Sequence, residues 1–177
     1  SQRRYPEIGR WAGMDLERYD WCPPYGHGEH ADVLIRFQRN SLDEGYEKVM
    51  DVCFTNNPYA GMYVMRKTGA SDCPIGYFAD TNAEYHAVMS YCVKKDKMTL
   101  VQKTLDRDHY LVYRTRTKVD DDGRLVEAHY GVLSGEWRFF EKGGMKINQV
   151  LFNPIPNDTN LEDVETMRRS RLRRAQN

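Results

Sequence analysis

The densest group of side chains that could bind a metal lies near the N-terminus, at His27, Glu29 and His30. Imidazole and carboxylate groups are ligands that suit zinc, nickel or iron. The spacing departs from the H-E-x-x-H motif, which needs two histidines four residues apart on a helix, and Gly26 and Gly28 disfavour a helix here. A metal site at these three residues is one hypothesis, and a polar surface loop is the other.

A second group consists of cations that alternate along the segment 110–119. In a strand, Arg114, Arg116 and Lys118 would share one face. A row of cations on a sheet could hold a phosphate, a sulfate or the carboxylate of a uronic acid. Alternatively, the row is a solvated face whose cations pair with Glu127 or Glu136 across neighbouring strands.

The aromatic residues form a third group, which is concentrated at the N-terminus. Trp11, Trp21 and Tyr25 could form a platform for sugar rings together with Tyr130 and Trp137, because aromatic faces present large and rigid apolar areas. Tryptophan and tyrosine also fill protein cores, which is the competing interpretation. The candidate ligand-binding residues are therefore Trp11, Trp21 and Tyr25 together with Arg114 and Arg116.

No residue pattern in the sequence indicates a catalytic site. The sequence contains no nucleophile elbow, no phosphate-binding loop and no dinucleotide-binding fingerprint. His86, His109 and His129 could act as general acids or bases, but isolated histidines are more often structural or surface residues. We therefore name no catalytic residue, the cofactor is left unknown, and a binding role is favoured over an enzymatic one.

Composition limits the classes of partner. The chain of 177 residues is 40% hydrophobic, and its 26 basic residues balance its 26 acidic residues. A formal net charge of zero gives no global attraction to nucleic acid, so no nucleic-acid partner is expected. No stretch approaches the roughly 20 apolar residues that span a bilayer, so no transmembrane segment is expected.

The four cysteines are widely spaced, at positions 22, 53, 73 and 92. No C-x-x-C pair occurs, which excludes a zinc ribbon or a thioredoxin-type motif. Cys53 and Cys92 lie in strand-like segments, where a free cysteine packs as a small hydrophobic side chain. An even count also permits two disulfides in an exported protein, so both states stay open.

The clearest structural element is a β-hairpin near the middle of the chain. The segments 110–119 and 124–133 are rich in β-branched and aromatic residues. They flank an acidic turn that ends in Asp122 and Gly123, and glycine supplies the positive φ that a tight hairpin turn needs. The acidic turn lacks the remaining ligands of an EF-hand, so we expect a solvated turn rather than a calcium site.

Further strands are indicated by alternating apolar residues. In the segment 32–38, Val33, Ile35 and Phe37 occupy one face, and Met50, Val52 and Phe54 do the same in the segment 46–54. The remaining strands are expected at 62–67, 84–94, 98–103, 137–140 and 146–152.

The two ends of the chain are expected to differ from this pattern. The segment 1–31 contains prolines, glycines and aromatics without a clear period, and we expect an irregular segment that covers the core. The segment 160–175 begins at Asn160, a good N-cap, and runs from acidic to basic residues, which favours a helix. The sequence therefore predicts one mainly β domain over 1–177, an antiparallel β-sandwich or open barrel of seven to eight strands with a C-terminal helix.

Residues 113–162 resemble the terminal β-sandwich region of exported bacterial proteins of undescribed function. The resemblance lies in YRTRT (113–117), DGRLVEAHYG (122–131) and the proline-containing FNPIPNDTNLE (152–162). It implies an extracellular or periplasmic protein and brings no site residues with it. The segment GEW at 135–137 departs from that pattern, and the N-terminal aromatic segment has no counterpart in it.

Three functions are consistent with these features. The leading hypothesis is a non-catalytic binding module of an exported protein, with a carbohydrate or another protein as the ligand. The second is a small enzyme that uses the loop of His27, Glu29 and His30, with or without a metal. The third is a structural subunit whose aromatic residues are covered in a larger assembly.

Overall fold

The computed structural model describes most of the chain, and the described residues form strands and loops. The described residues are 2–4, 6–55, 58–67, 77–95, 100–103, 108–134, 138–139, 144–147 and 149–162.

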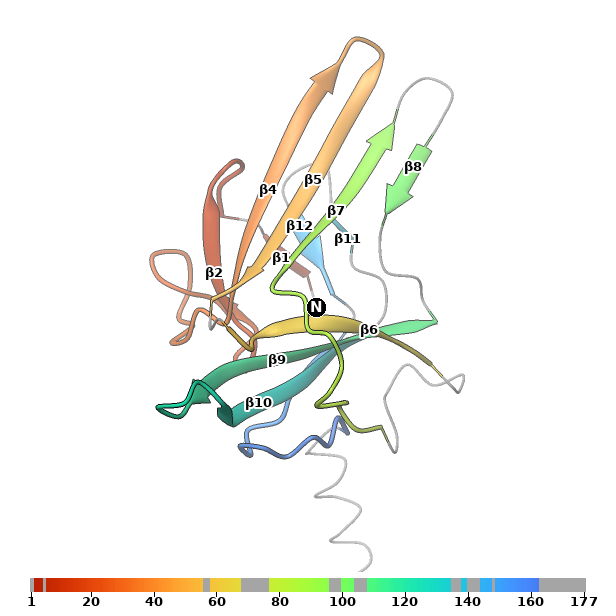
Figure 1. Ribbon diagram of the computed structural model, residues 1–177. Helices are drawn as coiled ribbons and strands as arrows, with labels where there is room; N and C mark the ends of the chain where they lie inside the picture. The colour runs from red at the N-terminus through yellow and green to blue at the C-terminus, as the bar shows by residue number, and fades with distance from the viewer. Residues whose placement is uncertain are drawn as a thin grey trace, which may run out of the picture.

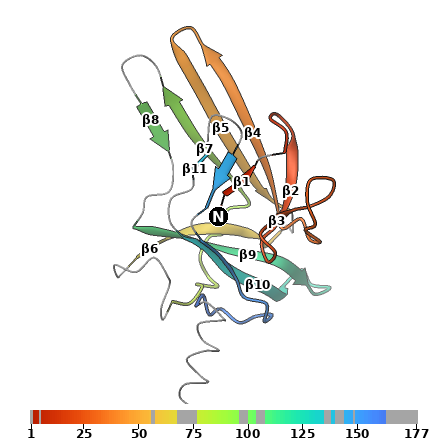
Figure 2. The same cartoon turned by 180° about the vertical axis from the view of Figure 1, so that it is seen from behind.

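The larger sheet contains six antiparallel strands (Figures 1 and 2). In spatial order they are β3 (Asp20–Trp21), β2 (Trp11–Asp15), β4 (Val33–Leu42), β5 (Gly45–Phe54), β7 (Val88–Lys95) and β8 (Leu100–Lys103). The hairpin of β4 and β5 pairs without interruption from Val33 and Phe54 to Leu42 and Gly45. Its far end extends away from the second sheet in Figure 1, with β7 paired alongside β5 as far as Tyr46.

The second sheet contains four antiparallel strands and runs across the first (Figure 1). Its order is β13 (Gln149–Phe152), β10 (Leu125–Ser134), β9 (His109–Val119) and β6 (Gly61–Arg66). A small third sheet contains β1 (Gln2–Arg4), β12 (Gly144–Lys146) and β11 (Arg138–Phe139).

The main hydrophobic core joins the two larger sheets. Ile35 and Met50 from the six-stranded sheet are fully buried in the same cluster as Leu111 and Tyr113 from the four-stranded sheet. The alternation of apolar residues in β4 and β5 therefore gives the buried face that the sequence predicts. Burial of this continuous apolar face is the main favourable contribution to stability.

The four-stranded sheet is buried on its other face as well. Tyr110, Val112 and Val132 point away from the main core and form a second cluster. The loops around residues 77–85 and 153–162 cover this cluster, with Ala79 and Leu161 buried in it. β9 thus has apolar neighbours on both sides.

The hairpin prediction is confirmed. β9 and β10 pair across a turn at Asp120–Gly123, where the Gly123 N–H donates to the Asp120 carbonyl at 2.9 Å and Gly123 has a φ of +76°. The strands expected at 84–94 and 98–103 are present as β7 and β8, which pair with each other. The strand expected at 146–152 is divided between β12 and β13.

The N-terminal prediction is wrong in part. Residues 11–15 and 20–21 are not irregular but form β2 and β3, and β2 pairs with β4. The expected C-terminal helix lies almost wholly outside the described residues, which end at Glu162.

The described cysteines are free thiols. Cys22, Cys53 and Cys92 are half-buried and form no disulfide with one another, and Cys73 lies outside the described residues. Burial and the nearby charges of Asp15 and Asp32 raise the pKa of Cys22, which keeps its thiol protonated.

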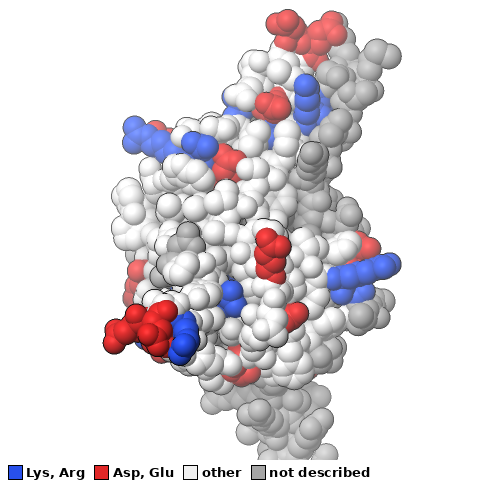
Figure 3. Space-filling model, in the orientation of Figure 1, with Lys and Arg blue, Asp and Glu red and all other residues white. Residues whose placement is uncertain are grey.

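Charged side chains of both signs are interspersed over the face shown in Figure 3. Acidic groups mark the tip of the β4–β5 hairpin, at Asp43 and Glu44, and the turn of the β9–β10 hairpin. Among the described residues, no helix is long and apolar enough to cross a membrane.

Candidate functional site

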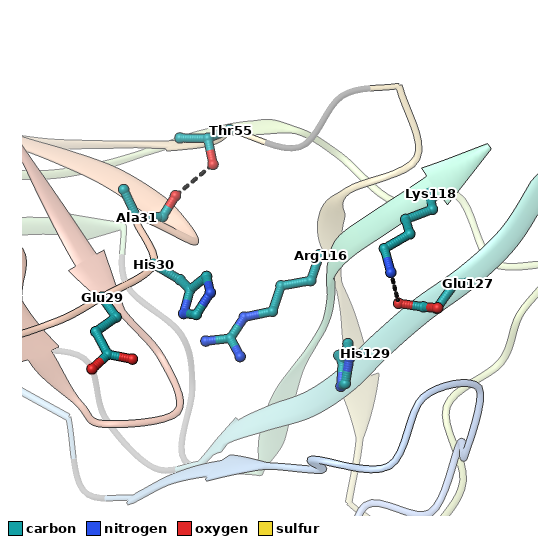
Figure 4. A pocket seen from close by; sticks show the side chains of 8 residues that line it. All are labelled: Glu29, His30, Ala31, Thr55, Arg116, Lys118, Glu127 and His129. Carbon is teal, nitrogen blue, oxygen red and sulfur yellow. Dashed lines mark hydrogen bonds and ion pairs between the residues drawn. The ribbon is translucent and has the colours of Figure 1, made fainter.

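A polar pocket opens where the loop after β3 approaches the β9–β10 hairpin (Figure 4). Its volume is about 590 Å³, within the range of small-molecule sites. Histidines and charged side chains dominate the lining, which consists of Glu29, His30, Ala31, Thr55, Arg116, Lys118, Glu127 and His129.

One wall of the pocket is organised by the buried carboxylate of Asp15 at the end of β2. Its Oδ1 accepts the backbone N–H groups of Glu17 and Arg18, each at 3.0 Å. Its Oδ2 accepts the N–H groups of Glu29 at 2.9 Å and His30 at 3.1 Å. One side chain therefore fixes both the turn after β2 and the loop that carries two lining residues.

Asp15 stays ionised although it is buried. Burial alone would raise its pKa, but the hydrogen bonds from the N–H groups of Arg18, His30 and Glu29 and the charge of Arg116 together lower it. The carboxylate is thus a permanent negative charge behind the pocket at neutral pH.

A second buried carboxylate, Asp32, connects the loop to β9. It accepts the backbone N–H of Leu16 at 2.9 Å and the hydroxyl of Thr115 at 3.1 Å. The guanidinium of Arg116 donates to both its oxygens, from Nε at 3.0 Å and from Nη2 at 3.2 Å.

Arg116 is held by further carboxylates. Its Nη2 lies 3.3 Å from Asp15 Oδ1, its Nη1 donates to Glu17, and its Cζ lies 4.5 Å from the ring centroid of Phe152. The guanidinium therefore sits among three carboxylates and one aromatic face. Burial alone would lower the pKa of Arg116, but the hydrogen bonds to Asp32 and Glu17 and the charges of these two carboxylates together raise it.

A β-bulge in β9 explains how Arg116 reaches these partners. His129 pairs with Thr115 and Glu127 pairs with Lys118, so β9 carries one more residue than β10 between these two pairs. Arg116 has a φ of +50°, unusual for a residue other than glycine. The extra residue lets Thr115 and Arg116 both contact Asp32 although they are adjacent in sequence.

This bulge corrects the expectation that Arg114, Arg116 and Lys118 share one face. Arg116 and Lys118 line the pocket, whereas Arg114 lies on the opposite face of the sheet. Arg114 donates to the carbonyls of Tyr59 at 2.7 Å and Thr81 at 3.2 Å. Its role is to connect loops, and it takes no part in this pocket.

His129 projects into the pocket from β10 (Figure 4). Its Nδ1 lies 3.2 Å from the carbonyl oxygen of Asn153, and its ring stacks on Phe152 with centroids 5.4 Å apart. The backbone carbonyl can only accept a hydrogen bond, so Nδ1 carries the proton. In the neutral ring, Nε2 is then a hydrogen-bond acceptor.

The remaining charged lining residues are paired. The Lys118 ammonium lies 2.7 Å from Glu127 on the neighbouring strand, as one of the two interpretations of the cationic row predicts. The other acidic partner considered there, Glu136, lies outside the described residues. Glu29 pairs with Arg18. Thr55 donates its hydroxyl to the carbonyl of Ala31 (Figure 4).

The residues of the hypothetical metal site do not converge. The His27 side chain is 97% exposed, with Nδ1 3.9 Å from Asp20, and Glu29 pairs with Arg18. The Nδ1 atom of His30 lies 4.0 Å from Oδ2 of Asp15. The part of the chain that the structure describes contains no group of three or more His, Cys, Asp or Glu side chains able to hold a metal ion.

The candidate aromatic residues lie outside this pocket. Trp21 is 4% exposed and belongs to the main core. Trp11 is 41% exposed, but the guanidinium of Arg36 lies 4.7 Å from its ring centroid. Tyr25 is 39% exposed and donates its hydroxyl to Glu7 at 3.3 Å. None of the three lines the pocket. Tyr130 is buried in the second cluster, and Trp137 lies outside the described residues.

Sequence reasoning missed Asp15, the residue that organises this site. Aspartate at the end of a strand often accepts N–H groups two and three residues ahead, and this local pattern was the available signal. The longer contacts of Asp15 with Glu29, His30 and Arg116 depend on tertiary structure.

Comparison with known proteins adds no candidate function. No protein-family model matches the chain, and no curated protein or solved structure is significantly similar to it.

Proposed function

We propose that this domain is a non-catalytic binding module built on an antiparallel β-sandwich, and that it holds a small carbohydrate in the pocket between the N-terminal loop and the β9–β10 hairpin. The observation that carries the proposal is a pocket of about 590 Å³ whose charged lining residues are already paired. The paired carboxylates keep spare lone pairs and His129 keeps a ring nitrogen that can accept, which suits the hydroxyl donors of a sugar.

The rigidity of the pocket wall supports the same function. Asp15 fixes the backbone at Glu29 and His30, and Asp15 and Asp32 together hold the guanidinium of Arg116. A preformed site loses little conformational entropy when a ligand binds. Such a wall suits recognition of a ligand by shape and hydrogen bonding.

An anionic ligand fits the site less well. A phosphate, a sulfate or a uronic acid was one of the two interpretations of the cationic row at Arg114, Arg116 and Lys118. However, Arg114 donates to backbone carbonyls on the far side of the sheet, and Arg116 is surrounded by carboxylates. The negative group of such a ligand would be repelled by the carboxylates that already surround Arg116.

A glycan-binding experiment tests the proposal. We expect at least one neutral or amino oligosaccharide from a broad panel to bind the wild type. The substitution His129→Ala should weaken binding by about fivefold, since a hydrogen bond is worth on the order of 1 kcal/mol. Trp11→Ala serves as the control for a surface aromatic platform and should leave the affinity unchanged.

Two results would contradict the proposal. One is a panel in which no glycan binds the folded protein. The other is binding that survives His129→Ala but is lost in Trp11→Ala, which would move the ligand to the outer face of the six-stranded sheet.

A further inference from the structure

The hydrogen-bonding groups that remain for a ligand are mainly acceptors. His129 commits its Nδ1 proton to Asn153 and offers Nε2 as an acceptor. Glu29 and Glu127 line the pocket, and a carboxylate accepts up to about four hydrogen bonds, so each keeps capacity beyond its present ion pair.

The donors in the lining are largely committed. Arg116 donates from Nε, Nη1 and Nη2 to carboxylates of this chain. The Lys118 ammonium pairs with Glu127, and its side chain is 67% exposed, so water can satisfy its other protons. A ligand must therefore supply donors to match the acceptors.

The charges around the pocket also favour a cation. Five carboxylates face three cations in the ion pairs that line and support the site, which leaves two formal negative charges when the histidines are neutral. The carboxylates are Asp15, Glu17, Glu29, Asp32 and Glu127, and the cations are Arg18, Arg116 and Lys118. A positive group placed among them gains Coulomb energy.

We infer that the ligand of this pocket presents a protonated amino group, so that sugars with a free amine are the class it takes; this rests on the carbohydrate-binding function proposed above. An ammonium group carries a positive charge and three donors, and it has no acceptor. It therefore matches both the spare acceptors and the excess of carboxylates. An N-acetyl group removes the charge, leaves one donor and adds a carbonyl acceptor, so acetylation should remove the match.

Three oligosaccharides of equal length test the inference by titration calorimetry with the whole chain. They are a glucosamine oligomer with free amines, its fully N-acetylated form and a neutral glucose oligomer. We expect the free amine to bind about tenfold or more tightly, which corresponds to about 1.4 kcal/mol. We also expect this preference to shrink at high salt, because part of it is electrostatic.

The outcomes separate this inference from the proposed function. Equal or tighter binding of the acetylated or neutral oligomer overturns the amine preference and leaves carbohydrate binding intact. Absence of binding for all three and for the wider glycan panel overturns both.

Charge-removing variants locate the amine. Glu127→Gln keeps the shape of the side chain and should lower the affinity for the glucosamine oligomer by about tenfold, with a smaller effect on the neutral oligomer. Glu47→Gln is the matched control, because Glu47 accepts from Asn40 on the outer face of the six-stranded sheet. If Glu127→Gln does not fold, Glu29→Gln at the more exposed edge replaces it. Unchanged amine preference in the folded pocket variants would contradict the inference.

Discussion

The contacts of Arg116 show how one side chain supports both stability and the pocket. Its guanidinium bridges the buried carboxylates of Asp15 and Asp32, and its side chain is only 18% exposed. The attraction within such a buried cluster adds little to the free energy of unfolding. Removal of one member lowers that free energy strongly, because a buried charge without its partner is unfavourable. Substitutions here should therefore affect the folding of the whole domain.

Replacement of Arg116 by methionine should lower the free energy of unfolding by about 3 kcal/mol or more, since Asp15 and Asp32 would stay buried without their cation. Urea unfolding measures the change. Lys118→Met is the control, because the ion pair of Lys118 is exposed and should be worth less than about 1 kcal/mol. Equal effects of the two substitutions would show that the cluster has no special role.

The lowered pKa of Asp15 predicts a pH dependence with a defined sign. Because the folded pKa lies below the ordinary value of 3.8, the ionised carboxylate stabilises the fold fully above that value. The contribution is lost as the pH falls through the folded pKa. The difference in Tm between the wild type and Asp15→Asn should be constant from neutral pH to about pH 5 and should narrow in stronger acid. A Tm difference that widens in acid would contradict the lowered pKa of Asp15 in the folded state.

At the scale of elements, local sequence was sufficient where a strand has a regular period. The buried face of β4 and the β9–β10 hairpin follow from alternation and from the Asp-Gly turn. β2 was missed because its five residues, WAGMD, include glycine and aspartate and are too few to show a period. It is a strand because it pairs with β4, and this information lies outside the segment.

The candidate site was harder to predict than the strands. Alternation along 110–119 placed Arg114 and Arg116 together, and the bulge at Arg116 separated them. A bulge adds one residue to one strand, and sequence period alone does not reveal where. His129 was recognised only as an isolated histidine, because its partner Asn153 is 24 residues away.

The close packing of β9 against β10 predicts the effect of one small substitution. Tyr113 crosses Gly131 and donates its hydroxyl to the carbonyl of Leu151 at 2.7 Å. A Cβ at position 131 would lie 2.2 Å from the Tyr113 hydroxyl and 2.3 Å from the Leu151 oxygen. Gly131→Ala should therefore destabilise the domain by about 3 kcal/mol in urea unfolding.

The control for this substitution is Gly123→Ala in the hairpin turn. A Cβ at Gly123 has no neighbour within 4 Å, and the cost there arises only from its positive φ, about 1 kcal/mol. If the two alanine variants lose the same stability, the steric argument at Gly131 is wrong.

At the scale of the whole molecule, the four-stranded sheet is the most enclosed part of the described fold. β9 is paired on both edges, by β10 and β6, and has an apolar cluster on each face. The outer half of the β4–β5 hairpin, by contrast, extends away from that sheet, and Arg39, Asn40 and Ser41 are exposed there. Local stability should differ accordingly.

Hydrogen–deuterium exchange measured by mass spectrometry can check this difference. Backbone amides of Leu111–Tyr113 in β9 should exchange slowest, whereas those of residues 39–46 should exchange much faster although they are also paired between strands. Equal protection of the two segments would mean that the domain opens only as a single unit.

The bond between Asp15 and Arg116 also has a consequence for how the chain is made. The two residues are 101 positions apart, so the ribosome must synthesise more than half of the chain before this contact can form. Until then Asp15 and Asp32 have no Arg116, and their charges must remain hydrated rather than buried. We expect a nascent chain that stops before β9 to lack the closed N-terminal loop, so the pocket is completed late in synthesis although one of its walls emerges first.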